Sequence, residues 1–311
     1  MTDVLSDILD TVDLKAAVYF RTDFHPDFAI AVPAYQRAAR FHMIVQGRCY
    51  VTLSDQTRVY LQSGDLVLVP HGAEHILSSE ETMEAAPLAD VMSLAGFTGS
   101  EPFVVGSGDS GKSCQMICGH FTFTQGADHP LLRSLPELLH VTAADRVMRP
   151  MLDEVLRLIV RRIFEGSPGV TASVSRLSEV LFIEIMRAGI AREPEIARLL
   201  SAVYDPQIGK SLSLIHDDVA KAWTVESLAA GVGMSRSRFA ERFRELVGMG
   251  PMAYIADWRL QRALNLLTKS NLPIKTVAHK IGYRSAAAFT RAFSEHFGRS
   301  PKEKRSSRTG N

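Results

Sequence analysis

The chain has 311 residues, of which 46% are hydrophobic and 22% charged, so it has enough apolar residues for more than one core and no sign of disorder. No run approaches ~18 uninterrupted apolar residues, and the acidic N-terminus lacks the basic-then-apolar order of a secretory signal, so we expect no membrane segment. The net charge of +1 hides a division, because residues 205–311 carry 18 Lys and Arg against 9 Asp and Glu, whereas residues 1–204 carry 17 against 25. A basic part joined to an acidic part is typical of a nucleic-acid reader attached to a segment that does not bind nucleic acid.

The first part of the chain is rich in short apolar runs separated by Gly, Pro, Asp and Gln. We predict strands at residues 17–20, 28–32, 41–45, 65–69 and 114–124. Several short strands without intervening helices favour an antiparallel sandwich or barrel. Residues 79–113 show little periodicity and are predicted to form a long irregular excursion.

The periodicity changes after Pro150. Apolar residues over 151–164 are spaced for one face of a helix, a second helix is predicted over 174–186, and a third begins near residue 205. The first two helices are joined by a tight break and form a predicted hairpin. We expect homodimerisation through this hairpin, and the other interpretation is that it only covers the barrel.

One pattern occurs twice near the C-terminus. Ser235, Phe239, Phe243, Gly248 and Pro251 recur at the same spacing as Ser285, Phe289, Phe293, Gly298 and Pro301. Each copy follows a short Ala-rich amphipathic segment that ends in Gly. A short helix, a glycine turn and a second helix that starts at Ser is the helix-turn-helix arrangement, whose second helix enters a DNA major groove.

The outward side of each predicted second helix carries the candidate DNA contacts. The phenylalanines lie on the other side and are predicted core residues. The candidates are Arg236, Ser237, Arg238, Glu241 and Arg244 in the first copy and Arg284, Ser285, Ala287, Thr290 and Arg291 in the second. Arg291 suits guanine, Glu241 suits cytosine N4, and Ala287 and Thr290 suit a thymine methyl group, whereas arginines near the helix starts suit phosphates. A predicted helix over 252–267, about 24 Å long, joins the two copies.

Residues 205–305 resemble the DNA-binding domain of the AraC/XylS family of bacterial transcription factors. The matching segments are 223–229, 234–243, 282–293 and 297–301. The resemblance implies seven helices with two helix-turn-helix units, contacts to double-stranded promoter DNA at Ser237, Glu241, Ala287 and Arg291, and activation through RNA polymerase. Ala286–Ala288 is short and apolar where polar base-reading side chains are expected, so the second unit is predicted to read fewer bases.

Gly64, Pro70, Gly72 and His75 match the second motif of cupin β-barrels. In metal-binding cupins the closing histidine is a ligand, but the expected upstream ligand positions hold Ala34, Gln36 and Arg40. We therefore predict no metal and no cofactor. His42 and His75 are instead the candidate effector-binding residues. Residues 20–190 also resemble, more loosely, the cupin sensor domain of one branch of the same regulators.

The three cysteines, Cys49, Cys114 and Cys118, are too few for a disulfide scaffold. If Cys114 and Cys118 share a strand, they lie about 13 Å apart, whereas a disulfide needs Cα atoms within roughly 7 Å. We therefore predict buried, unbridged thiols and a cytoplasmic protein.

Together these features predict an α+β chain. We expect a cupin-like antiparallel β-barrel sensor domain over 1–147, a helical linker and dimerisation hairpin over 148–204, and an all-α domain with two helix-turn-helix motifs over 205–311. The predicted function is sequence-specific transcriptional regulation, with activation favoured over repression. An unidentified small-molecule effector, sensed in the cupin-like domain, is expected to control it. The predicted chain is not an enzyme, is cytoplasmic and nucleoid-associated, and does not contact the membrane. The alternatives are a cupin-type metal-dependent enzyme with a helical appendage and a constitutive DNA-bound scaffold.

Overall fold

The computed structural model describes residues 3–35, 38–99, 102–108, 113–124, 129–133, 135–165, 168–189 and 194–306. The chain divides into two compact units, each assembled from segments that are distant in the sequence. The helical unit comprises Met1–Leu14, Phe123–Ser134 and Pro194–Asn311, and the sheet unit comprises Lys15–Thr122 and Leu135–Glu193. The expected domain boundaries, after residues 147 and 204, follow the order of the chain and stay predictions.

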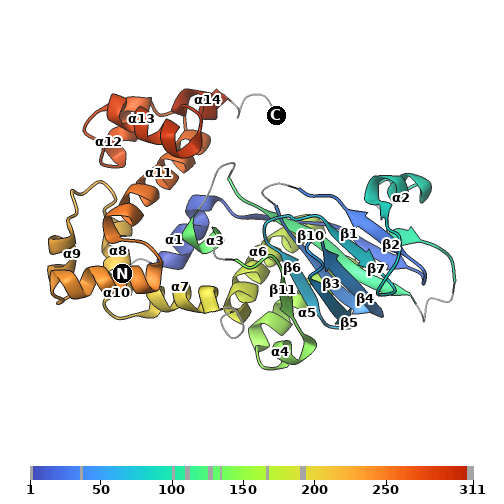
Figure 1. The fold of residues 1–311 in the computed structure, drawn as a ribbon. Coiled ribbons are helices and arrows are strands. Elements are labelled where there is room, and N and C mark those ends of the chain that lie inside the picture. Colours follow the sequence, from blue (N-terminus) through green and yellow to red (C-terminus); the bar gives the residue numbers. More distant parts are fainter. Residues whose placement is uncertain are drawn as a thin grey trace. The chain divides into compact units, whose positions relative to one another are not determined.

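The sheet unit contains two sheets, one of six strands in the order β11-β6-β3-β10-β1-β9 and one of five in the order β5-β4-β7-β2-β8 (Figure 1). The six strands are β1 Lys15–Phe24, β3 Ala38–Gln46, β6 Leu66–Val69, β9 Phe103–Val105, β10 Cys114–Thr122 and β11 Leu139–Val141. The five are β2 Ala29–Val32, β4 Arg48–Leu53, β5 Arg58–Gln62, β7 His75–Ser78 and β8 Ala86–Pro87. The five runs predicted as strands overlap β1, β2, β3, β6 and β10.

The prediction of a closed antiparallel barrel is wrong. The first sheet ends at β9 and β11 and the second at β5 and β8, and no strand of the described ranges pairs across from one sheet to the other. Two strand pairs, β1 with β9 and β2 with β8, are parallel. Strands β8 and β9 span only two and three residues, so they offer too few backbone hydrogen bonds to continue a ladder. The segment 79–113 holds more regular structure than we expected, since it contains β8, β9 and the helix α2 Leu88–Leu94.

One apolar core draws side chains from both sheets. Its members are Phe24, Phe28, Ile30, Val32, Ile44, Val51, Leu61, Val67, Leu77, Phe103 and Met116, together with all three cysteines. Helix α2 packs against this core through Leu88, Val91 and Met92. The cysteines are buried and unbridged, as predicted, with Cys114 and Cys118 both on β10.

Three helices complete the sheet unit, namely α4 Ala143–Val147, α5 Pro150–Glu165 and α6 Val170–Gly189. The predicted helices over 151–164 and 174–186 are therefore confirmed. Helices α5 and α6 pack against each other, and α6 also packs against β1. The inner face of α5 buries Leu152, Val155, Leu156 and Ile159.

The helical unit contains α1 Val4–Val12, α3 Pro130–Arg133, α7 Pro194–Tyr204, α8 Ile208–Asp217, α9 Val225–Gly231, α10 Arg236–Val247, α11 Pro251–Lys269, α12 Ile274–Lys280, α13 Ala286–Phe297 and α14 Pro301–Ser306. Helix α11 starts with Pro251, whose fixed φ angle suits a first helical turn, and its 19 residues span about 28 Å at ~1.5 Å per residue. It joins α10 to α12, as the predicted helix over 252–267 required.

Helix α1 was not predicted. The side chain of Asp3 caps it by accepting from the Ser6 amide, and Asp13 ends it with a φ of 52°. Leu5, Ile8, Leu9 and Val12 are buried, and the helix packs against α8 and α11. The N-terminal segment therefore belongs to the core of the helical unit.

Candidate DNA-binding surface and sensor site

Helices α9 and α10 form the first copy of the repeated pattern. Thr224 starts α9 with a capping box, in which Thr224 and Ser227 side chains each accept from the other's backbone amide. Gly233 turns the chain with a φ of 70°, a conformation that a side chain would strain, and α10 begins after Ser235. Phe239 and Phe243 of α10 are fully buried, as predicted.

Helices α12 and α13 repeat this geometry. The Ser285 hydroxyl caps α13 by accepting from the Ala288 amide, and Gly298 ends it in the left-handed conformation. Phe289 and Phe293 are fully buried beneath the helix, whereas Phe297 is only half-buried. The core positions of the repeat therefore hold both second helices with a defined side outward.

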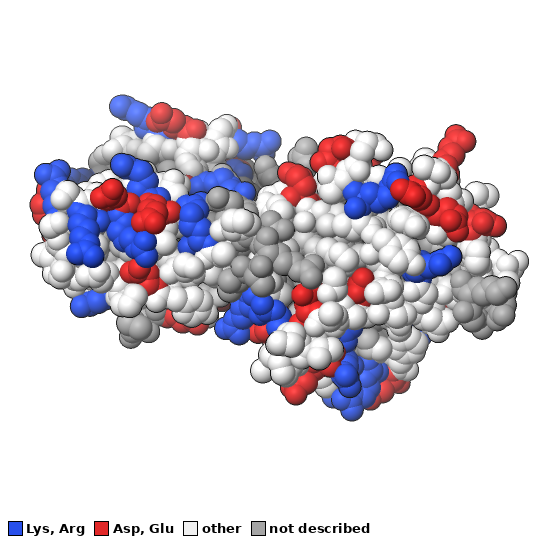
Figure 2. Space-filling model, turned by 60° about the horizontal axis from the view of Figure 1, so that its bottom comes forward, with Lys and Arg blue, Asp and Glu red and all other residues white. Residues whose placement is uncertain are grey.

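The candidate DNA contacts lie on that outward side. Nine of the ten are exposed and Thr290 is half-buried; the exposed nine are Arg236, Ser237, Arg238, Glu241, Arg244, Arg284, Ser285, Ala287 and Arg291. Figure 2 shows Lys and Arg side chains gathered over the helical unit, at the left, with fewer acidic side chains among them. The role of each residue at DNA stays a prediction.

Two arginines of α10 have partners within the protein. Arg236 pairs with Glu226 at 2.8 Å, but both side chains are more than half exposed, so this pair costs little to open on binding DNA. Arg242 bonds Asp205 and Glu245 at 3.1 and 2.9 Å and thereby ties α10 to the segment before α8. These two carboxylates raise the pKa of Arg242 and hold its guanidinium between them.

A buried polar cluster connects α1 to the helix between the two copies. His216 of α8 lies 2.8 Å from the Asp7 carboxylate through Nδ1 and 2.8 Å from the Tyr254 hydroxyl through Nε2. Its ring stacks on Trp258 at 3.9 Å between centroids. Burial lowers the pKa of His216, although Asp7 opposes this, so the neutral ring donates from Nδ1 to Asp7 and accepts from Tyr254 at Nε2. We did not predict this cluster from the sequence, because its members are up to 251 residues apart.

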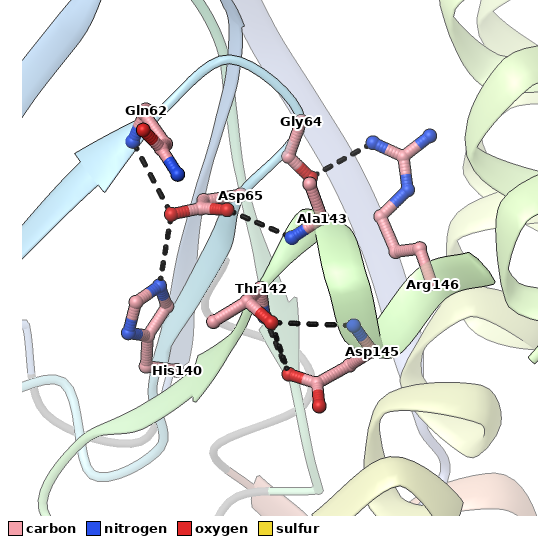
Figure 3. Close-up of polar contacts among 8 residues, drawn as sticks. All are labelled: Gln62, Gly64, Asp65, His140, Thr142, Ala143, Asp145 and Arg146. Atoms are coloured by element: carbon pink, nitrogen blue, oxygen red, sulfur yellow. Dashed lines mark hydrogen bonds and ion pairs between the residues drawn. The ribbon is translucent and has the colours of Figure 1, made fainter. Parts of the chain in front are cut away.

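The cupin-like motif begins at a turn that anchors the segment after β11 (Figure 3). The Asp65 carboxylate, almost fully buried, accepts from the amides of Ala143 and Gln62 at 2.8 and 3.2 Å and lies 3.2 Å from His140 Nε2. Beside it, Arg146 donates to the Gly64 carbonyl at 2.8 Å. These contacts give the motif a structural role at its first end.

At its other end the motif places His75 against His42. His75 Nδ1 lies 2.9 Å from the Ala73 carbonyl, which only accepts, so this nitrogen carries the proton. Burial lowers the pKa of His75 to about 4, so the ring is neutral and its Nε2 accepts from His42 Nε2 at 2.8 Å. His42 Nδ1 is then an acceptor and takes the Cys118 S–H at 3.1 Å. Burial also lowers the pKa of His42 and raises that of Cys118, which keeps the whole chain of three side chains neutral.

This chain of hydrogen bonds lies at the wall of a cavity of about 240 Å³. Phe24, Ile30, Val32, Leu77, Met92 and Phe103 form most of its surface, and Thr22, Arg40, His42 and Cys118 add polar groups. The structure thus brings His42 and His75 together, and His42 faces the cavity directly.

The prediction that no metal ion is bound was argued from the upstream ligand positions of the cupin motif, residues 34, 36 and 40. The described residues contain no group of three or more His, Cys, Asp or Glu side chains that could hold a metal ion. The side chain of Ala34 has no atom that could bind a metal, and the guanidinium of Arg40 is a cation without a free lone pair. Gln36 lies outside the described residues. Within the same described ranges, no helix has the length and apolar character needed to cross a membrane.

Comparison with known proteins identifies both parts of the chain. Residues 3–191 match the Cupin family model, and residues 228–307 match a Helix-turn-helix domain model. The transcriptional regulator AlkR of Acinetobacter baylyi is 33% identical over 97% of this chain and 99% of its own. An AraC-like transcription regulator of Streptomyces antibioticus is 28% identical over 96% of this chain and 97% of its own. The chain belongs to the AraC family of transcriptional regulators. A further relative of this AraC-family chain is the RCS-specific transcriptional activator RclR of Escherichia coli K12, which is 28% identical over 86% of this chain and 84% of its own.

This AraC-family chain is a DNA-binding transcriptional regulator with a cupin-like N-terminal part, as the sequence predicted. The interpretation as a metal-dependent enzyme loses its support, because these relatives are all described as regulators of transcription.

Proposed function

We propose that this AraC-family regulator binds promoter DNA through two helix-turn-helix units, α9–α10 and α12–α13, whose second helices enter successive major grooves. The supporting observation is that both α10 and α13 bury their phenylalanines and expose their candidate contacts. Helix α11, about 28 Å long, joins the two units, and its length is comparable to the ~34 Å of one DNA turn.

Each unit has its own balance of base and phosphate contacts. Arg291 reads guanine with both ends of its guanidinium, and Glu241 accepts from cytosine N4. Ala287 and Thr290 contact a thymine methyl group. Arg236, Arg238 and Arg284 hold phosphates and set the position of the helices, while Ser237, Arg244 and Ser285 add polar contacts beside them.

The sheet unit senses a small-molecule effector. The effector binds in the cavity beside His42 and His75 and has a higher affinity for one arrangement of the chain than for another. The difference between these two binding free energies sets how much the effector changes promoter occupancy. Strands β1 and β10 both line this cavity and both continue directly into segments of the helical unit, Met1–Leu14 and Phe123–Ser134. This continuity supplies a covalent route from sensor to reader.

The regulator acts as a homodimer through the α5–α6 hairpin. Four large apolar side chains of the hairpin are exposed, namely Met151, Leu158, Phe164 and Val180. A second copy of the same hairpin would remove this surface from water. In the cytoplasm, associated with the nucleoid, the dimer would activate transcription by contacting RNA polymerase, as the description of RclR as an activator suggests.

A footprint of the full chain tests this proposal. On DNA from the region next to its own gene, hydroxyl-radical cleavage should be reduced in two patches per protomer, about 10 base pairs apart. Arg238→Ala and Arg284→Ala should each weaken one patch, whereas Glu295→Ala, on the exposed surface of α13, should weaken neither. One patch per protomer would refute the two-unit reading. DNA affinity that no small molecule changes would favour the constitutive scaffold instead.

A further inference from the structure

The cavity of the sheet unit has walls that determine which chemistry it can accept. Its apolar side chains come from both sheets and from α2, which contributes Leu88 and Met92. At about 30 Å³ per water-sized group, a volume of about 240 Å³ holds roughly eight such groups, so the occupant is small.

Two polar side chains of the wall, His42 and Cys118, already use their hydrogen-bonding groups within the protein. Both nitrogens of His42 are used, one by Cys118 and one by His75. The Cys118 proton is committed to His42, and the Thr22 hydroxyl accepts from the Met116 amide at 3.1 Å. The Arg40 guanidinium lies over the Tyr35 ring at 5.4 Å from its centre. A polar ligand would lose its hydration and find both nitrogens of His42 and the Cys118 proton occupied, which costs free energy for each hydrogen bond that it cannot make there.

We propose that this cavity binds a small, uncharged, hydrocarbon-like molecule of the size of an alkylbenzene. The molecule replaces water at the apolar side chains and leaves the Cys118–His42–His75 chain intact. This inference rests on the proposed sensing function and adds the chemical class of the effector. An anionic ligand would instead have to draw Arg40, the one charged side chain of the described lining, away from Tyr35.

The test compares two probes of equal heavy-atom count, isopropylbenzene and benzoate, with the full chain. Isopropylbenzene at saturating concentration should raise the midpoint of thermal unfolding by on the order of 5 °C. Benzoate should leave it unchanged. Tighter binding of benzoate would overturn the inference in favour of an anion held by Arg40, and binding of neither probe would show that the cavity is only a packing gap.

Variants of α2 localise the binding. Met92 lines the cavity, whereas Leu94, two residues later, is 89% exposed. Met92→Trp fills the cavity and should weaken isopropylbenzene at least tenfold, while Leu94→Trp should not change its affinity. If Met92→Trp fails to fold, Met92→Ala serves, because the enlarged cavity should shift the preference from isopropylbenzene to butylbenzene. Equal effects of the two tryptophan substitutions, or an unshifted preference in Met92→Ala, would place the probe elsewhere and overturn the inference.

DNA affinity, measured in parallel, separates this inference from the proposed function. If isopropylbenzene binds with the expected dependence on Met92 but does not change DNA affinity, the ligand class holds and effector control fails. If another, polar compound changes DNA affinity and isopropylbenzene does not bind, effector control holds and the ligand class is wrong.

Discussion

The buried histidine pair should make the sheet unit sensitive to acid. The pKa of His75 falls from an ordinary 6.5 to about 4 because burial penalises the charged ring. Between these values the unfolded chain binds a proton that the folded chain excludes, so the free energy of unfolding is greatest above pH 6.5 and falls as the pH drops toward 4. The full shift corresponds to about 3 kcal/mol of stability lost across this window.

His75→Asn removes this titration. The free energy of unfolding should therefore depend less steeply on pH in the variant than in the unmodified chain. The slope should decrease by up to about 1.4 kcal/mol per pH unit, which corresponds to one proton fewer taken up on unfolding. The absolute stability of the variant also falls, but only the slope is compared.

Urea unfolding at several pH values between 4.5 and 7 measures the slope. Both tryptophans, Trp223 and Trp258, belong to the helical unit, so fluorescence follows that unit and the remaining circular dichroism transition follows the sheet unit. His279→Asn, at an exposed position, serves as the control and should keep the original slope. A slope for His75→Asn equal to that of the unmodified chain would refute the assigned neutral, buried state of His75.

Two further substitutions test the polar anchors. Asp7→Ala leaves the buried His216 Nδ1–H without its acceptor, so the helical unit should lose about 1–3 kcal/mol by tryptophan fluorescence in urea, whereas the exposed Asp10→Ala should cost less than about 0.5 kcal/mol. Equal effects would mean that α1 is not an integral part of that core. Asp65→Ala leaves the amides of Gln62 and Ala143 without their acceptor and should cost the sheet unit about 2–3 kcal/mol by calorimetry, with the exposed Glu74→Ala as the unchanged reference. If Asp65→Ala does not lower the stability of the sheet unit, the turn in Figure 3 does not depend on this carboxylate.

The helical repeat was predictable because its signals are local. Glycine turns, Ser at the helix starts and phenylalanines four residues apart specify α10 and α13 without reference to distant residues. The same spacing rules placed α5, α6 and α11. The apolar residues Leu5, Ile8, Leu9 and Val12 carry the same helical signal for α1, so this helix could have been found.

The features that we could not predict from the sequence are contacts between strands and side chains that lie far apart in the chain. The runs that form β1, β2, β3, β6 and β10 were visible, but the strands at which the two sheets end, β9, β11, β5 and β8, were not predicted. Of these, β8 and β9 span only two and three residues and are too short to carry a periodic signal. His42 and His75 were both identified as candidates. Their contact through Nε2, and that of His42 with Cys118, required the register of β3 with β10 and the fold of both sheets.

The central claim is that α10 and α13 present their exposed sides to DNA bases. Arg291, exposed on α13 above the buried Phe289 and Phe293, tests it most directly. The base preferences of the full chain and of Arg291→Ala should be measured by selection from a random DNA library at fixed salt concentration. The account predicts that preference is lost at one position, at a cost of about 1–3 kcal/mol of specific binding, while Glu295→Ala keeps the original profile. An unchanged profile for Arg291→Ala would contradict it.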